Sequence, residues 1–292
     1  MNDRDRKKDP TRAPEDLHEA EFLLDMPDRG PIVGRAWKPG GNAGTIGLLH
    51  GLGDHAGRYG RIVEALAARG FSVEALDLPG HGRSYGPRGH VRTWSDFSEA
   101  MDAWWARPRA NGARLDAIVG HSMGSLVALE FALRHPDRLR ALVLSAPPFE
   151  VVVRATMLKV RMAQVIVRLW PGFTQHTPIL PSMLSRDPDV VRAHNEDPLV
   201  HYLMSARLFF EFTRATRDLK RRAPELPVPT LLIHGTGDVV SSHRGSERWV
   251  QTTPAGRAEL RLYPGLFHEL LNEPEGPAIA GEIADWLRIT LA

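Results

Sequence analysis

Residues 118–136 read IVGHSMGSLVALEFALRHP, and this stretch decides the fold. Its beginning is a short apolar run typical of a buried strand, and after Ser122 the apolar spacing becomes that of a helix. Between the two lies the pattern G-x-S-x-G, made of Gly120, His121, Ser122, Met123 and Gly124. A chain that passes from strand into helix this tightly leaves no room for a Cβ two positions before or after the serine. The pattern predicts a strained turn that exposes the Ser122 hydroxyl above the end of a sheet.

Short apolar runs alternate with helical patterns along the rest of the chain, as in a parallel sheet built from strand–helix–strand units. These runs are residues 45–51, 71–78, 115–122, 139–147, 230–238 and 258–265. Several are apolar nearly throughout, which is expected where helices cover both faces of a sheet. Residues 20–27 and 31–39 are predicted to pair as an antiparallel hairpin at the sheet edge. The expected fold class is α/β, with a mostly parallel central sheet and helices on both faces.

The alternation breaks down in residues 148–227, where the sequence shows no clear strand. An insertion between two core strands explains the gap, so we expect a helical lid there and a core made of residues 17–147 and 228–292. Residues 1–16 are charged and contain proline, which predicts a disordered tail. No apolar stretch suits a signal peptide or a membrane span, so the expected location is cytoplasmic.

Composition excludes several classes of function. The chain of 292 residues has no cysteine, which excludes disulfides, thiolate catalysis and cysteine-ligated metals. Its formal net charge is only +2, and basic and aromatic residues do not interleave, so nucleic acid is not an expected partner. The oligomeric state is not predictable from these features.

A serine hydroxyl needs a base to accept its proton and an acid to orient that base. After a serine turn of this kind, the acid and then the histidine follow further along the chain. Asp238 ends one of these runs, and His268 follows the last one. Asp54 and Asp77 also follow strands, but both precede Ser122. We therefore predict Asp238 as the acid and His268 as the base.

Two backbone amides should stabilise the negative oxygen that forms when the serine attacks a carbonyl. The first is that of Met123, next to the nucleophile, and the second is that of Leu52 in the loop after an early strand. In this loop His50, Gly51 and Gly53 are expected to support the oxyanion hole, His50 by hydrogen bonding. His50, Asp54 and His55 also suggest a two-zinc loop, but Leu52 occupies a position that such a loop fills with histidine. No metal and no cofactor are expected.

These motifs together resemble the monoacylglycerol lipase and lysophospholipase branch of the α/β-hydrolase superfamily. The matching blocks run in order from about residue 45 to 275, with Ser125 standing where the family usually has a third glycine. They are HGLGDHAGRYGRI (50–62), DLPGHGRSYGPRGHV (77–91), GHSMGS (120–125), NEDPLVH (195–201), GTGDVVSS (235–242) and YPGLFHELLNE (263–273).

The resemblance implies a serine hydrolase that cleaves the ester of a single-chain acyl lipid, with monoacylglycerol as the leading substrate. Lysophospholipids and simple carboxylic esters are alternative substrates for the same mechanism. C–C bond hydrolysis and cofactor-free haloperoxidation are alternative reactions that could use the same three residues, Ser122, Asp238 and His268. The alternative outside the enzymes is a non-catalytic binding protein, but such proteins usually lack one of the three triad residues, and all three are present here. The segment 151–169 contains Arg154, Lys159 and Arg161 and fits either peripheral membrane contact or a lid helix whose cations face water.

Overall fold

The computed structural model describes residues 11, 17, 19–39, 41, 43–109, 112–152 and 170–292. The expected tail and the segment with Arg154, Lys159 and Arg161 lie outside these ranges. The exception is Thr11, whose carbonyl oxygen accepts a hydrogen bond from the Gly60 amide at 2.6 Å. None of the helices in the described ranges combines the length and apolarity that a transmembrane segment requires.

Within these residues the centre of the molecule is one eight-stranded sheet. Its first three strands in space pair antiparallel and the others parallel, so the predicted edge hairpin and the mostly parallel core are confirmed. In spatial order the strands are β1 (Glu19–Met26), β2 (Gly30–Trp37), β4 (Ser72–Leu76), β3 (Thr45–Leu49), β5 (Ala117–His121), β6 (Ala141–Ser145), β9 (Thr230–Gly235) and β10 (Ala258–Tyr263).

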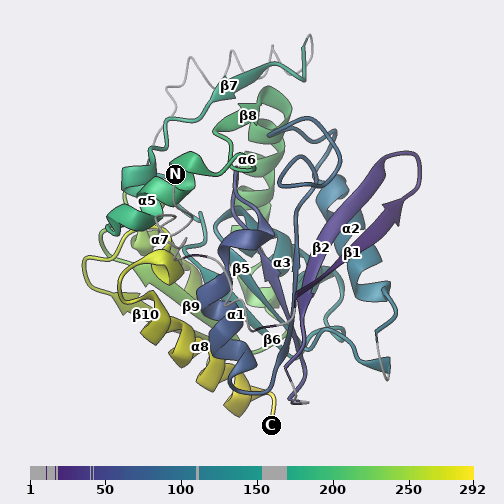
Figure 1. Cartoon of the computed structure of the whole chain (residues 1–292). Helices are drawn as coiled ribbons and strands as arrows, with labels where there is room; N and C mark the ends of the chain where they lie inside the picture. The colour runs from purple at the N-terminus through teal and green to yellow at the C-terminus, as the bar shows by residue number, and fades with distance from the viewer. Residues whose placement is uncertain are drawn as a thin grey trace, which may run out of the picture.

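Helices cover both faces of this sheet (Figure 1). One face packs against α1 (Gly60–Ala67) and α8 (Gly276–Thr290), and the other against α2 (Ser95–Ala106), α3 (Met123–Arg134), α6 (Ala206–Arg221) and α7 (His243–Val250). Alternate residues of the central strands enter the two cores: in β6, Val143 faces α1 and α8, whereas Leu142 and Leu144 face α2 and α3. Burial on both faces explains why these strands are apolar throughout.

The insertion occupies the chain between β6 and β9. Its described part contains α5 (Pro188–Glu196), α6 and the 3₁₀ turns Pro181–Met183 and Ala223–Glu225. It also contains a small antiparallel sheet of β7 (Thr174–His176) and β8 (Leu203–Ser205), which the sequence did not predict. α6 packs against α3 and joins the main core, whereas β7, β8 and α5 lie beyond the carboxyl ends of the parallel strands (Figure 1).

Candidate active site

The turn between β5 and α3 is as tight as its sequence predicts. Ser122 has φ 49° and ψ −118°, a strained conformation for a residue with a side chain. A Cβ on Gly120 would lie 2.5 Å from the carbonyl oxygen of Gly124, and a Cβ on Gly124 would lie 2.5 Å from that of His50. Only glycine fits at either position, and the turn lifts Ser122 above the carboxyl edge of the sheet.

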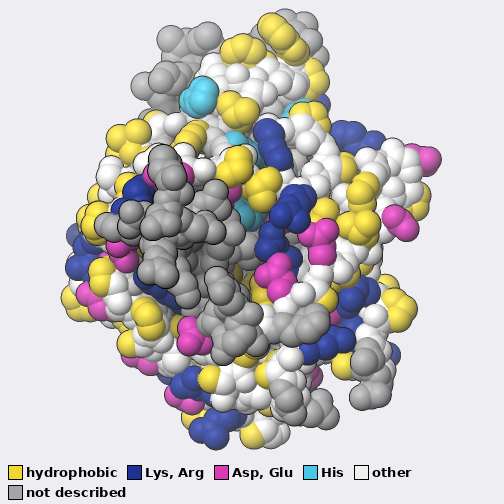
Figure 2. All heavy atoms as spheres, viewed as in Figure 1, with side chains coloured by type: hydrophobic (Ala, Val, Ile, Leu, Met, Phe, Trp, Pro, Cys, Tyr) yellow, Lys and Arg dark blue, Asp and Glu magenta, His cyan; other side chains and the backbone are white. Residues whose placement is uncertain are grey.

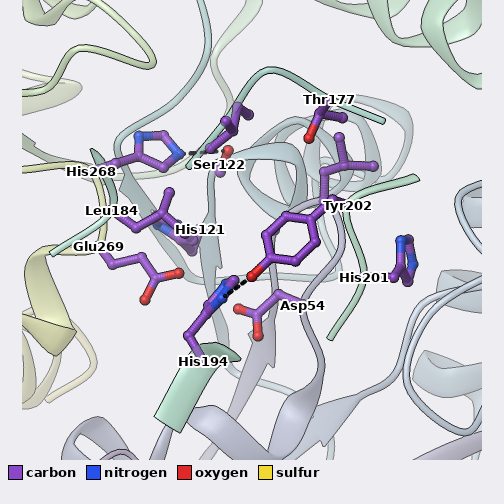
Figure 3. A pocket seen from close by; sticks show the side chains of 13 residues that line it. Asp54, His121, Ser122, Thr177, Leu184, His194, His201, Tyr202, His268 and Glu269 are labelled. Atoms are coloured by element: carbon purple, nitrogen blue, oxygen red, sulfur yellow. Dashed lines mark hydrogen bonds between the residues drawn. The ribbon is translucent and has the colours of Figure 1, made fainter. Parts of the chain in front are cut away.

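Three side chains from different strand ends meet at this edge. His268, after β10, has its Nε2 2.9 Å from the Ser122 hydroxyl (Figure 3). Its Nδ1 lies 2.7 Å from Oδ2 of Asp238, which follows β9. Because the carboxylate can only accept, Nδ1 carries the proton and Nε2 is free to accept from the serine.

The charges of this site shift the pKa values of both ionisable partners. Burial alone would raise the pKa of Asp238, but the neighbouring His268 and hydrogen bonds from surrounding donors hold it well below the usual range. Burial would lower the pKa of His268, yet the charge and hydrogen bond of Asp238 outweigh it and raise that pKa above the usual value. Asp238 is therefore ionised, and the imidazolium form of His268 is stabilised.

The loop after β3 lies directly beside the nucleophile. A Cβ on Gly51 would come within 3.3 Å of the Ser122 side chain. No described residue accepts a hydrogen bond from the amide of Leu52 or Met123, the two donors that the sequence predicts for an oxyanion hole. His50 joins this loop to the next strand end, because its Nδ1 donates to the Gly51 carbonyl at 2.7 Å and its Nε2 accepts from the Leu78 amide at 2.9 Å.

Two other segments are joined to this loop of residues 50–55, which is named the oxyanion loop after its predicted role. They are the insertion and the loop after β10 that carries His268, named the histidine loop. The His201 amide, in the insertion, donates to the Gly53 carbonyl at 2.9 Å. Arg58 pairs with Asp54 at 3.0 Å and, through both terminal nitrogens, with Glu269 at 3.1 and 2.9 Å. All three of these charged side chains are buried. Sequence reasoning missed the Arg58–Glu269 pair, which joins two loops far apart in the chain.

A pocket opens at Ser122. Leu52, Ile179 and Leu184 contribute apolar side chains to its lining. A polar group also lines it, in which His194 Nδ1 and the Tyr202 hydroxyl are 3.0 Å apart (Figure 3). The insertion supplies both residues of this pair, and no sequence pattern indicated them.

The histidines of the 50–55 loop have protein partners. His55 Nε2 donates to Asp197 of the insertion at 2.9 Å, and both nitrogens of His50 are hydrogen-bonded. Asp54 is paired with Arg58 and accepts from the Tyr59 hydroxyl at 3.1 Å. In the part of the chain that the structure describes, no group of three or more His, Asp or Glu residues is arranged to hold a metal ion.

A parallel sheet with a serine elbow, followed by acid and histidine loops at the same edge, defines the α/β-hydrolase class. The profile of the family described as "Serine aminopeptidase, S33" matches residues 40–275. Monoacylglycerol lipase of Mycolicibacterium smegmatis is 34% identical over 259 residues, covering 88% of this chain and 92% of that protein. Phospholipase YtpA of Bacillus subtilis is 27% identical over 241 residues, covering 82% of this chain and 93% of that protein.

A solved structure, that of Paleococcus ferrophilus monoacylglycerol lipase, superimposes with a TM-score of 0.79 at 29% identity, covering 94% of this chain and 99% of that one. The chain belongs to the S33 family of α/β-hydrolases and, within it, to the monoacylglycerol lipase branch that its motifs resemble.

Proposed function

We propose that this protein hydrolyses the ester bond of a single-chain acyl lipid, with monoacylglycerol as the preferred substrate, through an acyl-enzyme on Ser122. One observation carries the proposal: a continuous hydrogen-bonded chain runs from Ser122 through His268 to Asp238 beside a pocket. Such a chain activates a hydroxyl that is otherwise a poor nucleophile.

In the first half of the reaction, Ser122 Oγ attacks the ester carbonyl carbon while its proton passes to His268 Nε2. The amides of Leu52 and Met123 hold the oxyanion of the tetrahedral intermediate. When that intermediate collapses, the bond to the alcohol oxygen breaks and His268 returns the proton to this oxygen. The alcohol leaves, and Ser122 carries the acyl group.

In the second half, water attacks the acyl carbon and gives a proton to His268. The bond to Ser122 Oγ breaks, the serine recovers the proton and a fatty acid is released. Asp238 stays ionised throughout and stabilises the imidazolium at each transfer.

Two features support monoacylglycerol as the substrate. The pocket combines apolar residues, which suit an acyl chain, with the His194–Tyr202 pair, which can hydrogen-bond to a small polar alcohol. The similarity to proteins named monoacylglycerol lipase points the same way. The similarity to a protein named phospholipase keeps a lysophospholipid as the second candidate, beside simple carboxylic esters.

A substrate panel tests this proposal. Purified protein and its Ser122→Ala variant are given monoacylglycerols, diacylglycerols, lysophospholipids, p-nitrophenyl esters of graded length and an aminoacyl p-nitroanilide. We expect the highest kcat/KM with a monoacylglycerol and no hydrolysis by the variant. Preference for the anilide would replace the lipase assignment with an aminopeptidase one, and activity that survives Ser122→Ala would refute the mechanism.

We further propose that the insertion covers the pocket as a lid and touches the membrane from which substrate comes. Trp170 and Leu180, which flank β7, are 66% and 56% exposed. Hydrophobic side chains gather in the region over β7 and β8 on the face in Figure 2. Exposed apolar residues close to a lipid-binding pocket favour partition into a membrane surface.

A vesicle assay tests the membrane contact. Trp170→Ser together with Leu180→Ser should weaken co-sedimentation with anionic phosphatidylglycerol vesicles and leave hydrolysis of a short soluble ester unchanged. The matched control is Ile289→Ser, which removes a 74% exposed side chain near the end of α8, far from β7 (Figure 1). Equal vesicle binding by the double variant and the control would exclude this surface as the contact.

A further inference from the structure

A second histidine hydrogen-bonds to Asp238. His234, in β9, has a completely buried side chain. Its Nε2 lies 3.2 Å from Oδ2 of Asp238 and 3.1 Å from the carbonyl oxygen of Ser241. Its Nδ1 lies 2.8 Å from the hydroxyl of Ser246 in α7. The mechanism above makes no use of this residue.

These contacts determine where the proton of His234 lies. Three oxygens face Nε2: Oδ2 of Asp238, the carbonyl oxygen of Ser241 and, at 3.4 Å, the Ser241 hydroxyl. The two nearer oxygens can only accept hydrogen bonds, so Nε2 must donate. The hydroxyl of Ser246 can donate to Nδ1 and so hold this tautomer. His234 is thus fixed between α7 and the carboxylate, with its N–H directed at Asp238.

The carboxylate of Asp238 is held at both oxygens. Oδ1 accepts from the amides of Val240 and Ser241 at 2.8 and 2.9 Å. Oδ2 is shared by His268 Nδ1 at 2.7 Å, the Ser241 hydroxyl at 3.0 Å and His234. The two imidazoles therefore donate to the same oxygen of the same carboxylate.

We propose that His234 is a positioning residue for the reaction: it orients the Asp238 carboxylate toward His268 and shares the charge of Oδ2. This inference rests on the proposed function, since it assumes that His268 is the base. A carboxylate that gives part of its hydrogen bonding to a second donor stabilises the imidazolium less strongly. The orientation of His268 and its pKa should both depend on His234.

Two substitutions at this position separate donation from packing. His234→Leu fills the space without a donor, whereas the side-chain amide of His234→Gln can still donate toward Asp238. We expect His234→Leu to lower kcat for a short soluble ester by roughly tenfold to a hundredfold, as the loss of a hydrogen bond to a charged group predicts. KM should change little, and His234→Gln should recover most of kcat.

The pKa of His268 gives a readout that does not require turnover. Removing a donor from Oδ2 leaves more negative charge facing His268, so His234→Leu should raise the pKa of His268 above that of the wild type and His234→Gln should not. The ring can be followed by NMR of its labelled Cε1 during a pH titration. The other titratable groups that face it, Asp238, Glu269 and His121, are unchanged in both variants.

Ile233→Val is the matched control, because Ile233 is the preceding residue of β9 and packs in the core on the opposite face of the sheet. It should leave kcat and the pKa of His268 as in the wild type. If His234→Leu and His234→Gln have the same kcat and the same pKa of His268, the positioning role is refuted. This holds even if both variants have a lower melting temperature than the wild type. A wild-type protein that hydrolyses no ester would refute the proposed function alone, because the NMR titration still decides the role of His234.

Discussion

At the scale of single residues, Ser122 concentrates the strain of the site. A non-glycine residue in its backbone conformation costs about 1–3 kcal/mol, which the surrounding structure must offset. Ser125 stands where the family usually has glycine, yet it fits: its amide and its hydroxyl both donate to the Ser122 carbonyl, at 3.0 and 2.5 Å. This pair of hydrogen bonds supports the first turn of α3 behind the nucleophile.

Substitution of Asp238 by asparagine tests the assigned acid. The amide cannot stabilise an imidazolium and can select the wrong tautomer of His268, so kcat should fall by about 10⁴, as in other serine triads. The measurement is the steady-state rate on a short ester, with circular dichroism to verify the fold. A rate within tenfold of the wild type would mean that another carboxylate is the acid.

The pH dependence of kcat/KM tests the assigned base. The reaction needs neutral His268, and Asp238 raises the pKa of this histidine above its usual value. Activity should therefore be complete at alkaline pH and be lost as pH falls through that raised pKa, which lies above about 6.5. An acid limb centred well below pH 6 would contradict the ion pair between His268 and Asp238.

Much of this site was predictable residue by residue. Ser122 directly follows β5, and Asp238 and His268 lie in the loops after β9 and β10. Parallel strands bring their carboxyl ends to one edge, so sequence order was enough to predict that the three residues meet. His234 and the Arg58–Glu269 pair were not predictable. Their partners are set by how strands and loops pack, and nothing in the local pattern around them differs from an ordinary buried or charged residue.

At the scale of elements, the strands of the sheet were predictable because most of them lie in short, largely apolar runs bounded by turn residues. β7 and β8 were not, since three residues are too few to show an alternating pattern. Residues 148–227 were predicted to form a helical lid, and the described part of this segment contains α5 and α6 as well as β7 and β8. Its action as a lid stays a prediction.

Gly124, in the turn between β5 and α3, allows α3 to lie close to the oxyanion loop, and its substitution tests this contact. Gly124→Ala would place a Cβ 2.5 Å from the carbonyl oxygens of Leu49 and His50, so α3 and the oxyanion loop would have to separate. We expect kcat to fall at least a hundredfold and stability by about 1–3 kcal/mol, by overpacking. Gly172→Ala is the control, because its Cβ would meet nothing within 4 Å. Equal activity in the two variants would show that the elbow tolerates a side chain.

At the scale of the whole molecule, Arg58 joins the loop after β3 to the loop after β10. Arg58→Met would leave Asp54 and Glu269 buried without their cation, at a cost of about 3–5 kcal/mol in the free energy of unfolding. The control is Arg83→Met, which breaks a half-exposed pair with Glu21 worth about 0–1 kcal/mol. Urea unfolding of both variants measures the difference. Similar losses would mean that the buried pair contributes no more than a surface one.

The whole molecule also brings the insertion, the oxyanion loop and the histidine loop around one hydroxyl. The central claim is that this hydroxyl, of Ser122, carries the acyl group during turnover. Mass spectrometry of protein quenched in acid during hydrolysis of a p-nitrophenyl ester tests it most directly. The acyl mass should appear on the peptide that contains Ser122 and be absent from Ser122→Ala. An acyl group found on another residue would contradict the account. So would turnover that forms no acyl adduct and continues in Ser122→Ala.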